Sequence, residues 1–271
     1  MNKELPTQSD DVFKSRKALR EFCIKNKVAC PEFFVSEDFA KISAWAIKHN
    51  KFPMAIKAEE DSINEENSYL LKAFRELPEC FDLIKAKAKN IVIVEEFIEG
   101  KPKIEVCCLK GKIRMFSQIS LEKSIILKHS WRAFPISVPA KIAKDIKDII
   151  DKFKPYCENL AVPVRFSFAI NKSLPVLISA DAGLMRPEYN KEWAVAANIP
   201  PILEESGLYK CDGICKVVYK RNVDFASFNP DTLKSVCAPA FVLYQKNGED
   251  LIVFLKHADA QILQKASIFS I

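Results

Sequence analysis

The sequence predicts an α+β protein, and three observations carry this prediction. Residues 91–94 form an uninterrupted β-branched run, which is typical of a strand buried on both faces. Residues 139–157 begin with a proline that can open a helix, Pro139, and then repeat apolar side chains at helical spacing. Near the end of the chain, three further apolar runs indicate strands: 214–219, 239–245 and 250–256.

Composition indicates an ordinary globular protein. Of the 271 residues 49% are hydrophobic, and 41 basic against 35 acidic residues give a formal charge of +6. This mild excess suits an anionic ligand but is no nucleic-acid signature. No apolar run reaches the roughly 18 residues of a membrane span, and residues 1–11 lack the features of a signal peptide. We therefore expect a cytoplasmic protein with neither membrane nor nucleic-acid partners.

The nine cysteines do not indicate a metal or disulfide framework. None are spaced as Cys-x-x-Cys, and the one close pair, Cys211 and Cys215, lacks histidine partners at zinc-finger spacing. Most lie in apolar runs, where a thiol behaves as a small hydrophobic group. We interpret them as reduced core residues.

The N-terminal elements alternate between helix and strand. Asp10 and Asp11 can cap a basic helix, and Ser36 a second helix after a short strand at 33–35. A buried strand then runs over 52–57 and carries Lys57 at its end. The acidic segment 58–68 indicates a loop, after which a helix is expected through residues 69–75.

The rest of the chain is rich in strands. A turn at Lys110-Gly111 joins two of them, and residues 120–138 are expected to be irregular. Strands follow at 162–170 and 174–180, then helices within about 188–208. No linker separates domains cleanly.

Two motifs and their order resemble a known family. Phe52-Pro-Met-Ala-Ile-Lys57 is similar to a strand whose lysine reaches nucleotide phosphates, and Val94-Glu-Glu-Phe-Ile-Glu-Gly100 to a hinge that reads adenine. Lys17, or Lys14 in another register, stands on the opening basic helix. In this order they resemble the ATP-grasp superfamily over residues 10–208.

This resemblance implies two α+β subdomains that clamp ATP, with an added β-rich segment at the C-terminal end. The subdomains are expected at 1–95 and 96–208, and the extension, an added sheet or dimer surface, at 209–271. The implied activity is an ATP-dependent carboxylate–amine ligase that works through an acyl-phosphate on small-molecule substrates. In this reading Arg165 is catalytic and Asp181 binds Mg²⁺. The implied nucleotide-binding residues are Lys17, Lys57, Glu95, Glu96, Phe97, Ile98 and Glu105.

The departures from the family pattern fall on the metal site. Ser167 and Ser179 stand where the family has an aspartate and a glutamate, so little carboxylate remains for Mg²⁺. A relocated cage of Glu105, Asp181 and Glu188 is an alternative. The acidic segment 58–68 replaces the glycine-rich loop that covers the phosphates. A second hypothesis is therefore a non-catalytic relative that binds a nucleotide or other anion, or acts as a homodimer or partner subunit.

Several candidate residues also have structural interpretations. Lys57 could reach solvent from the strand end, and Glu95 could be a solvated acid. Arg165 lies between apolar strand residues, where a guanidinium needs a partner. A basic loop could line an acceptor site or be plain surface; its candidates are Lys128, His129 and Arg132.

Overall fold

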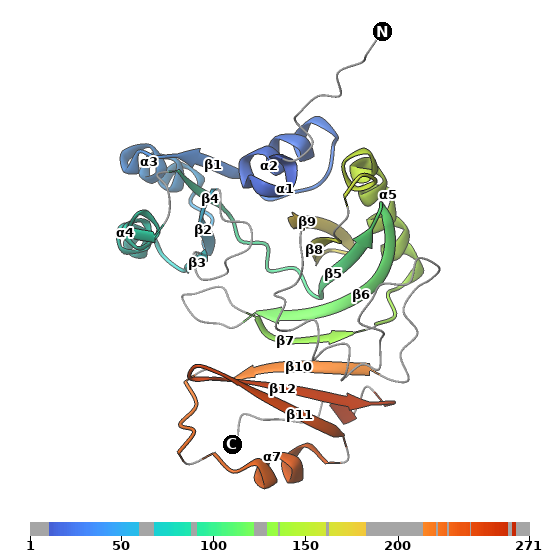
Figure 1. Cartoon of the computed structure of the whole chain (residues 1–271). Coiled ribbons are helices and arrows are strands. Elements are labelled where there is room, and N and C mark those ends of the chain that lie inside the picture. The colour runs from blue at the N-terminus through green and yellow to red at the C-terminus, as the bar shows by residue number, and fades with distance from the viewer. Residues whose placement is uncertain are drawn as a thin grey trace. The chain divides into compact units, whose positions relative to one another are not determined.

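A computed structural model gives the architecture, and it confirms the α+β class (Figure 1). The chain forms two compact units, the first of residues 1–112, 122–128 and 139–183, the second of residues 113–121, 129–138 and 184–271. The predicted boundaries after residues 95 and 208 divide the chain differently and stay a prediction. Of the described helices none is long and apolar enough to cross a membrane. The described residues are 11–59, 68–87, 91–121, 129–134, 136–160, 163–182, 214–220, 222–226, 228–238, 240–259 and 262–263.

The first unit begins with two short helices where one was predicted. α1 (Asp11–Lys14) ends at Ser15, whose hydroxyl accepts a hydrogen bond from the Ala18 N–H at 3.0 Å and caps α2 (Arg16–Lys25). Asp11 thus lies inside a helix, and Asp10 is outside the described residues. The buried face of α2 includes Arg20 beside apolar side chains.

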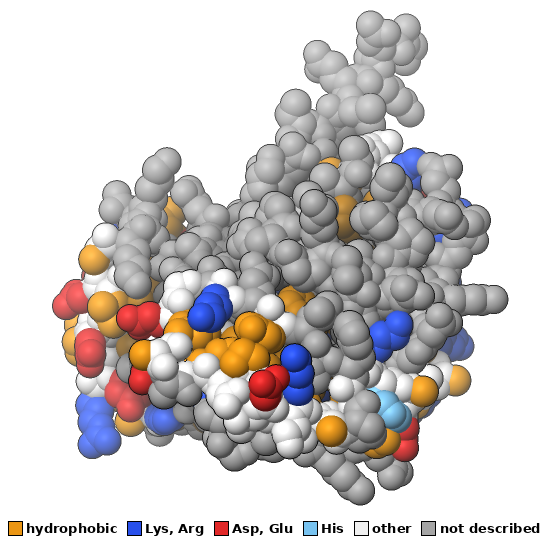
Figure 2. Space-filling view, turned by 60° about the horizontal axis from the view of Figure 1, so that its bottom comes forward, with side chains coloured by type: hydrophobic (Ala, Val, Ile, Leu, Met, Phe, Trp, Pro, Cys, Tyr) orange, Lys and Arg blue, Asp and Glu red, His pale blue; other side chains and the backbone are white. Residues whose placement is uncertain are grey.

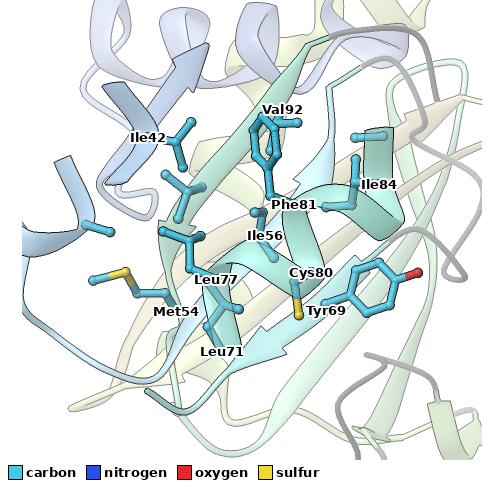
Figure 3. Close-up of a cluster of buried hydrophobic side chains, with 13 residues drawn as sticks. Ile42, Met54, Ile56, Tyr69, Leu71, Leu77, Cys80, Phe81, Ile84 and Val92 are labelled. Atoms are coloured by element: carbon cyan, nitrogen blue, oxygen red, sulfur yellow. The ribbon is translucent and has the colours of Figure 1, made fainter. Parts of the chain in front are cut away.

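A four-stranded antiparallel sheet follows, in the order β1 (Phe33–Ser36), β4 (Val92–Glu96), β2 (Met54–Ala58), β3 (Ser68–Leu71). One face packs against α3 (Phe39–His49) and α4 (Leu77–Lys87), around a cluster of buried hydrophobic side chains that includes Ile56 and Val92 (Figure 3). Because side chains alternate along a strand, the opposite face of β2 carries Ala55 and Lys57.

Two predictions in this sheet region were wrong. Residues 69–75 contain no long helix: β3 extends to Leu71, and a single 3₁₀ turn, η2 (Phe74–Glu76), precedes α4. α3 is capped by Asp38, whose carboxylate accepts from the Ala40 N–H at 2.8 Å, whereas Ser36 only accepts from the Asp38 N–H. Residues 68–71 pair with β2 and so extend the sheet, whereas at α3 two neighbouring polar residues, Ser36 and Asp38, offered competing start signals.

The first unit also contains β5 (Lys103–Leu109), β8 (Val164–Asn171) and β9 (Leu174–Ala182), with β8 antiparallel to both others. The predicted helix is α5 (Ala140–Cys157), and Pro139 is its N-cap as expected. Phe153 on its buried face lies 4.2 Å from the Phe22 ring and 5.1 Å from the Phe166 ring, centroid to centroid. These contacts attach α5 to both α2 and β8.

The second unit is a sheet of five described strands, ordered β11 (Phe241–Asn247), β12 (Asp250–His257), β10 (Ile214–Lys220), β7 (His129–Phe134), β6 (Lys112–Leu121). α7 (Pro230–Cys237) packs its buried Leu233 into the core of this sheet. The predicted late strands are confirmed, but β7 contradicts the irregular structure expected over 120–138. The predicted helices near 188–208 fall outside the described residues. On the face of the molecule that Figure 2 shows, a group of exposed hydrophobic side chains has charged side chains beside it.

Candidate functional site

Three charged side chains from separate elements meet inside the first unit. Register pairs Ala55 with Glu95, so Glu95 and Lys57 share the face of the sheet that lies opposite α3 and α4. The Lys57 ammonium donates to Glu95 Oε1, and Arg20 donates to Glu95 Oε2 from Nε at 3.1 Å and from Nη2 at 2.8 Å. All three are buried, with exposed fractions of 6%, 1% and 2% for Lys57, Glu95 and Arg20.

Arg20 also donates hydrogen bonds to a strand that comes much later in the sequence of the unit. Its Nη1 donates to the Leu177 carbonyl at 3.2 Å and its Nη2 to the Ile178 carbonyl at 2.7 Å, both in β9. One guanidinium therefore joins α2, β4 and β9, which the planar, five-donor fork of arginine allows and a lysine does not.

The electrostatics of this Arg20–Glu95–Lys57 cluster favour a bound anion. Burial would raise the Glu95 pKa, but Arg20 and Lys57 outweigh it and lower that pKa to about 2. Burial lowers the pKa of Lys57 to about 8, because attraction to Glu95 is opposed by repulsion from Arg16 and Arg20. With two cations for one carboxylate, the cluster carries a net positive charge near neutral pH.

Glu59 fixes the start of α2 next to the end of β2. Its carboxylate accepts from the Ser15 hydroxyl and, at 3.2 Å, from the Lys17 N–H. Arg16 donates from Nε to the Ala58 carbonyl at 3.1 Å, and its charge acts on both Lys57 and Asp181. The opening helix thus presents Arg16 and Arg20 to the site.

Lys17, the predicted phosphate contact on that helix, does not join them. Its side chain is 54% exposed and forms an i,i+4 ion pair with Glu21 at 3.9 Å. The side chain of Lys14 lies outside the description.

A second polar group lies on one face of β5, β8 and β9. Cross-strand register places Glu105 opposite Ser167, and Ser167 opposite Ser179. Ser167 donates from Oγ to Glu105 Oε1 at 3.2 Å. Arg165 Nε lies 3.8 Å from Glu105 Oε1, and its Nη2 lies 3.6 Å from Asp181 Oδ2. Three residues singled out from the sequence, Glu105, Arg165 and Asp181, are therefore in contact.

The residues of this Glu105–Arg165–Asp181 group fit Mg²⁺ poorly. Magnesium prefers carboxylate oxygens in octahedral array, whereas here both acids are ion-paired to a guanidinium and hydroxyls stand at positions 167 and 179. Within the described ranges, no three acidic, histidine or cysteine residues gather in a metal-binding arrangement. Glu188, which the relocated cage requires, lies outside those ranges.

The predicted adenine hinge follows β4 and borders an open pocket of about 420 Å³, within the size range of small-molecule sites. Two hinge donors are already used: the Glu96 N–H by the Glu32 carbonyl at 2.9 Å and the Phe97 N–H by the Pro53 carbonyl at 3.3 Å. Phe97 and Ile98 both line the pocket. The remaining lining residues are Lys51, Phe52, Pro53, Glu96, Glu99, Gly100 and Asn171.

Lys103, which the sequence did not single out, lies over this hinge. Its ammonium is 4.5 Å from the centroid of the Phe97 ring and 3.4 Å from the Ile98 carbonyl oxygen. Burial lowers its pKa to about 8, and repulsion from Lys57 adds to the effect. The position of Lys103 directly after Pro102 gave no indication in the sequence that its side chain would lie over Phe97.

Other candidates lie elsewhere or are not described. Arg132 is buried in the second unit, the side chain of His129 is not described, and Lys128 lies outside the described residues.

The seven cysteines whose side chains are described are free thiols. Two of them interact: Cys23 and Cys30 share a hydrogen bond that, with the nearby Arg20 charge, lowers the pKa of Cys30 to about 7.

The fold is shared with solved ligase structures. N5-carboxyaminoimidazole synthetase from Staphylococcus aureus, complexed with ADP, has a TM-score of 0.69 at 9% identity, covering 95% of this chain and 70% of that chain. L-amino acid ligase from Bacillus licheniformis has a TM-score of 0.66 at 11% sequence identity, covering 97% of this chain and 71% of that chain. Phosphoribosylamine–glycine ligase from Thermotoga maritima has a TM-score of 0.63 at 14% sequence identity, covering 97% of this chain and 77% of that chain. No protein-family model matches the sequence, and no curated protein matches it. At these identities the likeness shows a common fold.

Proposed function

The chain has the ATP-grasp fold, and from this premise we propose that it binds ATP in the first unit. The observation that carries the proposal is the buried cluster of Arg20, Lys57 and Glu95, in which two cations face one carboxylate. A net positive charge that is shielded from water attracts a polyphosphate more strongly than an exposed lysine does.

The hinge supplies the complementary features for a base. Phe97 and Ile98 line the pocket, and the Lys103 ammonium lies 4.5 Å from the centroid of the Phe97 ring, where we expect it to contact phosphate or ribose oxygens. In this arrangement Phe97, Ile98 and Lys103 position the nucleotide, while Lys57 and Arg165 contact its phosphates. The solved complex of the S. aureus synthetase with ADP is consistent with such a ligand.

Calorimetric titration with ATP tests the proposal. We expect saturable binding, and a loss of affinity of about tenfold or more for Lys103→Gln, because a charge-assisted contact contributes on the order of 1.5–3 kcal/mol. The matched control is Lys72→Gln, an exposed lysine of the same unit, which should bind as the wild type does. No saturable binding of ATP or ADP by the folded protein would refute the proposal.

A second candidate function is ATP-dependent carboxylate–amine ligation through an acyl-phosphate. It is favoured by the sequence resemblance, which implies that Lys57 and Arg165 are phosphate-binding cations, and by the ligases that share the fold. The two acids held by Arg165 oppose it, since phosphoryl transfer depends on cations that stabilise the developing charge.

Product analysis separates the two functions. The protein is offered ATP with a panel of amino acids and small carboxylates, ADP is measured, and hydroxylamine is added to trap any acyl-phosphate as a hydroxamate. ADP and hydroxamate that depend on one carboxylate would establish the ligase. Nucleotide binding with no turnover for any acceptor would leave binding as the function.

A further inference from the structure

The Glu105–Arg165–Asp181 group has an unusual charge arrangement. Glu105 is 3% exposed and Asp181 6%, so both carboxylates are removed from water. A buried carboxylate is costly unless a cation or several donors compensate it. Arg165 lies within 4 Å of both, with Nε nearest to Glu105 and Nη2 nearest to Asp181.

The guanidinium is a permanent cation. Arginine side chains are not deprotonated in proteins, and because the guanidinium is covalently attached it cannot dissociate as a metal ion can. Burial raises the pKa of Asp181, while the charges of Arg165 and Arg16 oppose that rise. The same attraction would hold a divalent metal between these acids if Arg165 were absent.

Two hydroxyl groups, those of Ser167 and Ser179, also compensate the buried carboxylates. Ser167 donates to Glu105 at 3.2 Å, and a hydrogen bond from Ser179 also opposes the rise that burial causes in the pKa of Asp181. A hydroxyl that donates its proton to a carboxylate compensates charge without adding any, which suits acids already paired with a cation.

We propose that Arg165 acts as a built-in cation in the place of a divalent metal, so that ligand phosphates are bound without Mg²⁺. Arg165 and the two acids form a preassembled group with no exchangeable ion. The nucleotide part of this inference rests on the proposed function, whereas the exclusion of metal by Arg165 does not.

Metal binding tests the inference without any nucleotide. Mn²⁺ is a hard cation that suits the same oxygen ligands, and its binding is followed by electron paramagnetic resonance. We expect the wild type to take up no stoichiometric Mn²⁺. Arg165→Gln removes the guanidinium, leaves both acids, and should gain a Mn²⁺ site that Mg²⁺ displaces. The matched control is Arg75→Gln, an exposed arginine of the same unit, which should gain none.

Two results would overturn the inference: stoichiometric Mn²⁺ uptake by the wild type, or a folded Arg165→Gln protein that gains no site. If that variant does not fold, the wild-type measurement decides. For the nucleotide, the wild-type affinity for ATP should agree within about twofold between EDTA and Mg²⁺, and a gain of about tenfold with Mg²⁺ would contradict the inference. If ATP does not bind under either condition, the proposed function fails while the Mn²⁺ comparison still decides the role of Arg165.

Discussion

Arg20 directs two of its donors at one oxygen of Glu95, from Nε at 3.1 Å and from Nη2 at 2.8 Å, with both side chains 2% exposed. Arg20→Met would leave Glu95 buried with only Lys57, and breaking a buried pair in this way costs about 3–5 kcal/mol. We therefore expect a clear fall in the free energy of unfolding, measured by urea denaturation.

The matched control for this prediction is on the same helix. Lys17 is exposed and its pair with Glu21 is long, so Lys17→Met should change stability by no more than about 0.5 kcal/mol. Equal effects of the two substitutions would show that Arg20 is not held by the buried contacts described above.

Nucleotide binding should take up protons in mildly alkaline solution. The pKa of Lys57 and that of Lys103 are both lowered to about 8, and a neighbouring phosphate favours the protonated ammonium. At about pH 8.5 the free lysines are largely neutral and the bound ones charged, so affinity falls as pH rises above about 8.

Calorimetry in buffers with different ionisation enthalpies measures this proton uptake. Lys103→Gln should reduce the uptake without abolishing it, because Lys57 remains. At about pH 6.5 both lysines are already protonated and contribute no uptake. Identical uptake at the two pH values would place the phosphates away from these residues.

Cys30 should react as an acidic thiol. Its hydrogen bond with Cys23 and the charge of Arg20 lower its pKa to about 7, against the opposing effect of burial. Alkylation by iodoacetamide, followed by mass spectrometry, should show a rate at Cys30 that rises with pH about a midpoint near 7.

Two variants check the cause of that acidity. Cys30→Ser should remove the fast reaction, and Cys23→Ala should move the Cys30 midpoint upward because the donor to its sulfur is lost. A wild-type midpoint at the ordinary thiol value of about 8.5 would contradict the described contact.

Gly100 should not tolerate a side chain. A Cβ at this position would lie 2.6 Å from the Ile170 carbonyl oxygen, which belongs to the backbone of β8 and has little freedom to move. Gly100→Ala is expected to destabilise the fold by about 1–3 kcal/mol and to weaken ATP binding by displacing the hinge.

The neighbouring exposed residue Glu99 provides the comparison for this substitution. Glu99→Ala should leave stability within about 0.5 kcal/mol of the wild type in thermal unfolding. A fully stable Gly100→Ala protein would mean that the hinge and β8 can separate without cost.

Much of the architecture could be predicted from apolar runs. The strands around Lys57 and Glu95, the turn at Lys110 and α5 were found because their patterns are regular. β7 was missed because its alternation is broken: the buried positions of this strand include Arg132 as well as Phe134. A charged residue in the buried phase of a short strand hides the period on which the prediction depends.

The candidate site was predicted in part for a similar reason. Lys57, Glu95, Arg165 and Asp181 lie at strand positions where a charge interrupts an apolar run. Arg20 lies between Leu19 and Cys23 on the buried helix face, and this placement was a usable signal. Its partners could not be read from the sequence, because they come from β4 and β9, which only the tertiary fold brings together.

The contact between Arg20 and the Ile178 carbonyl spans 158 positions of the chain, and this distance bears on how the protein is made. During synthesis α2 leaves the ribosome long before β9. The Arg20 guanidinium therefore cannot contact the Ile178 carbonyl until most of the first unit has been translated. Contacts so remote in sequence also slow folding, since a long loop must close before they form. The contacts of α2 are thus completed by one of the last strands of its unit, and a nascent chain that ends before residue 177 lacks both β9 acceptors of Arg20.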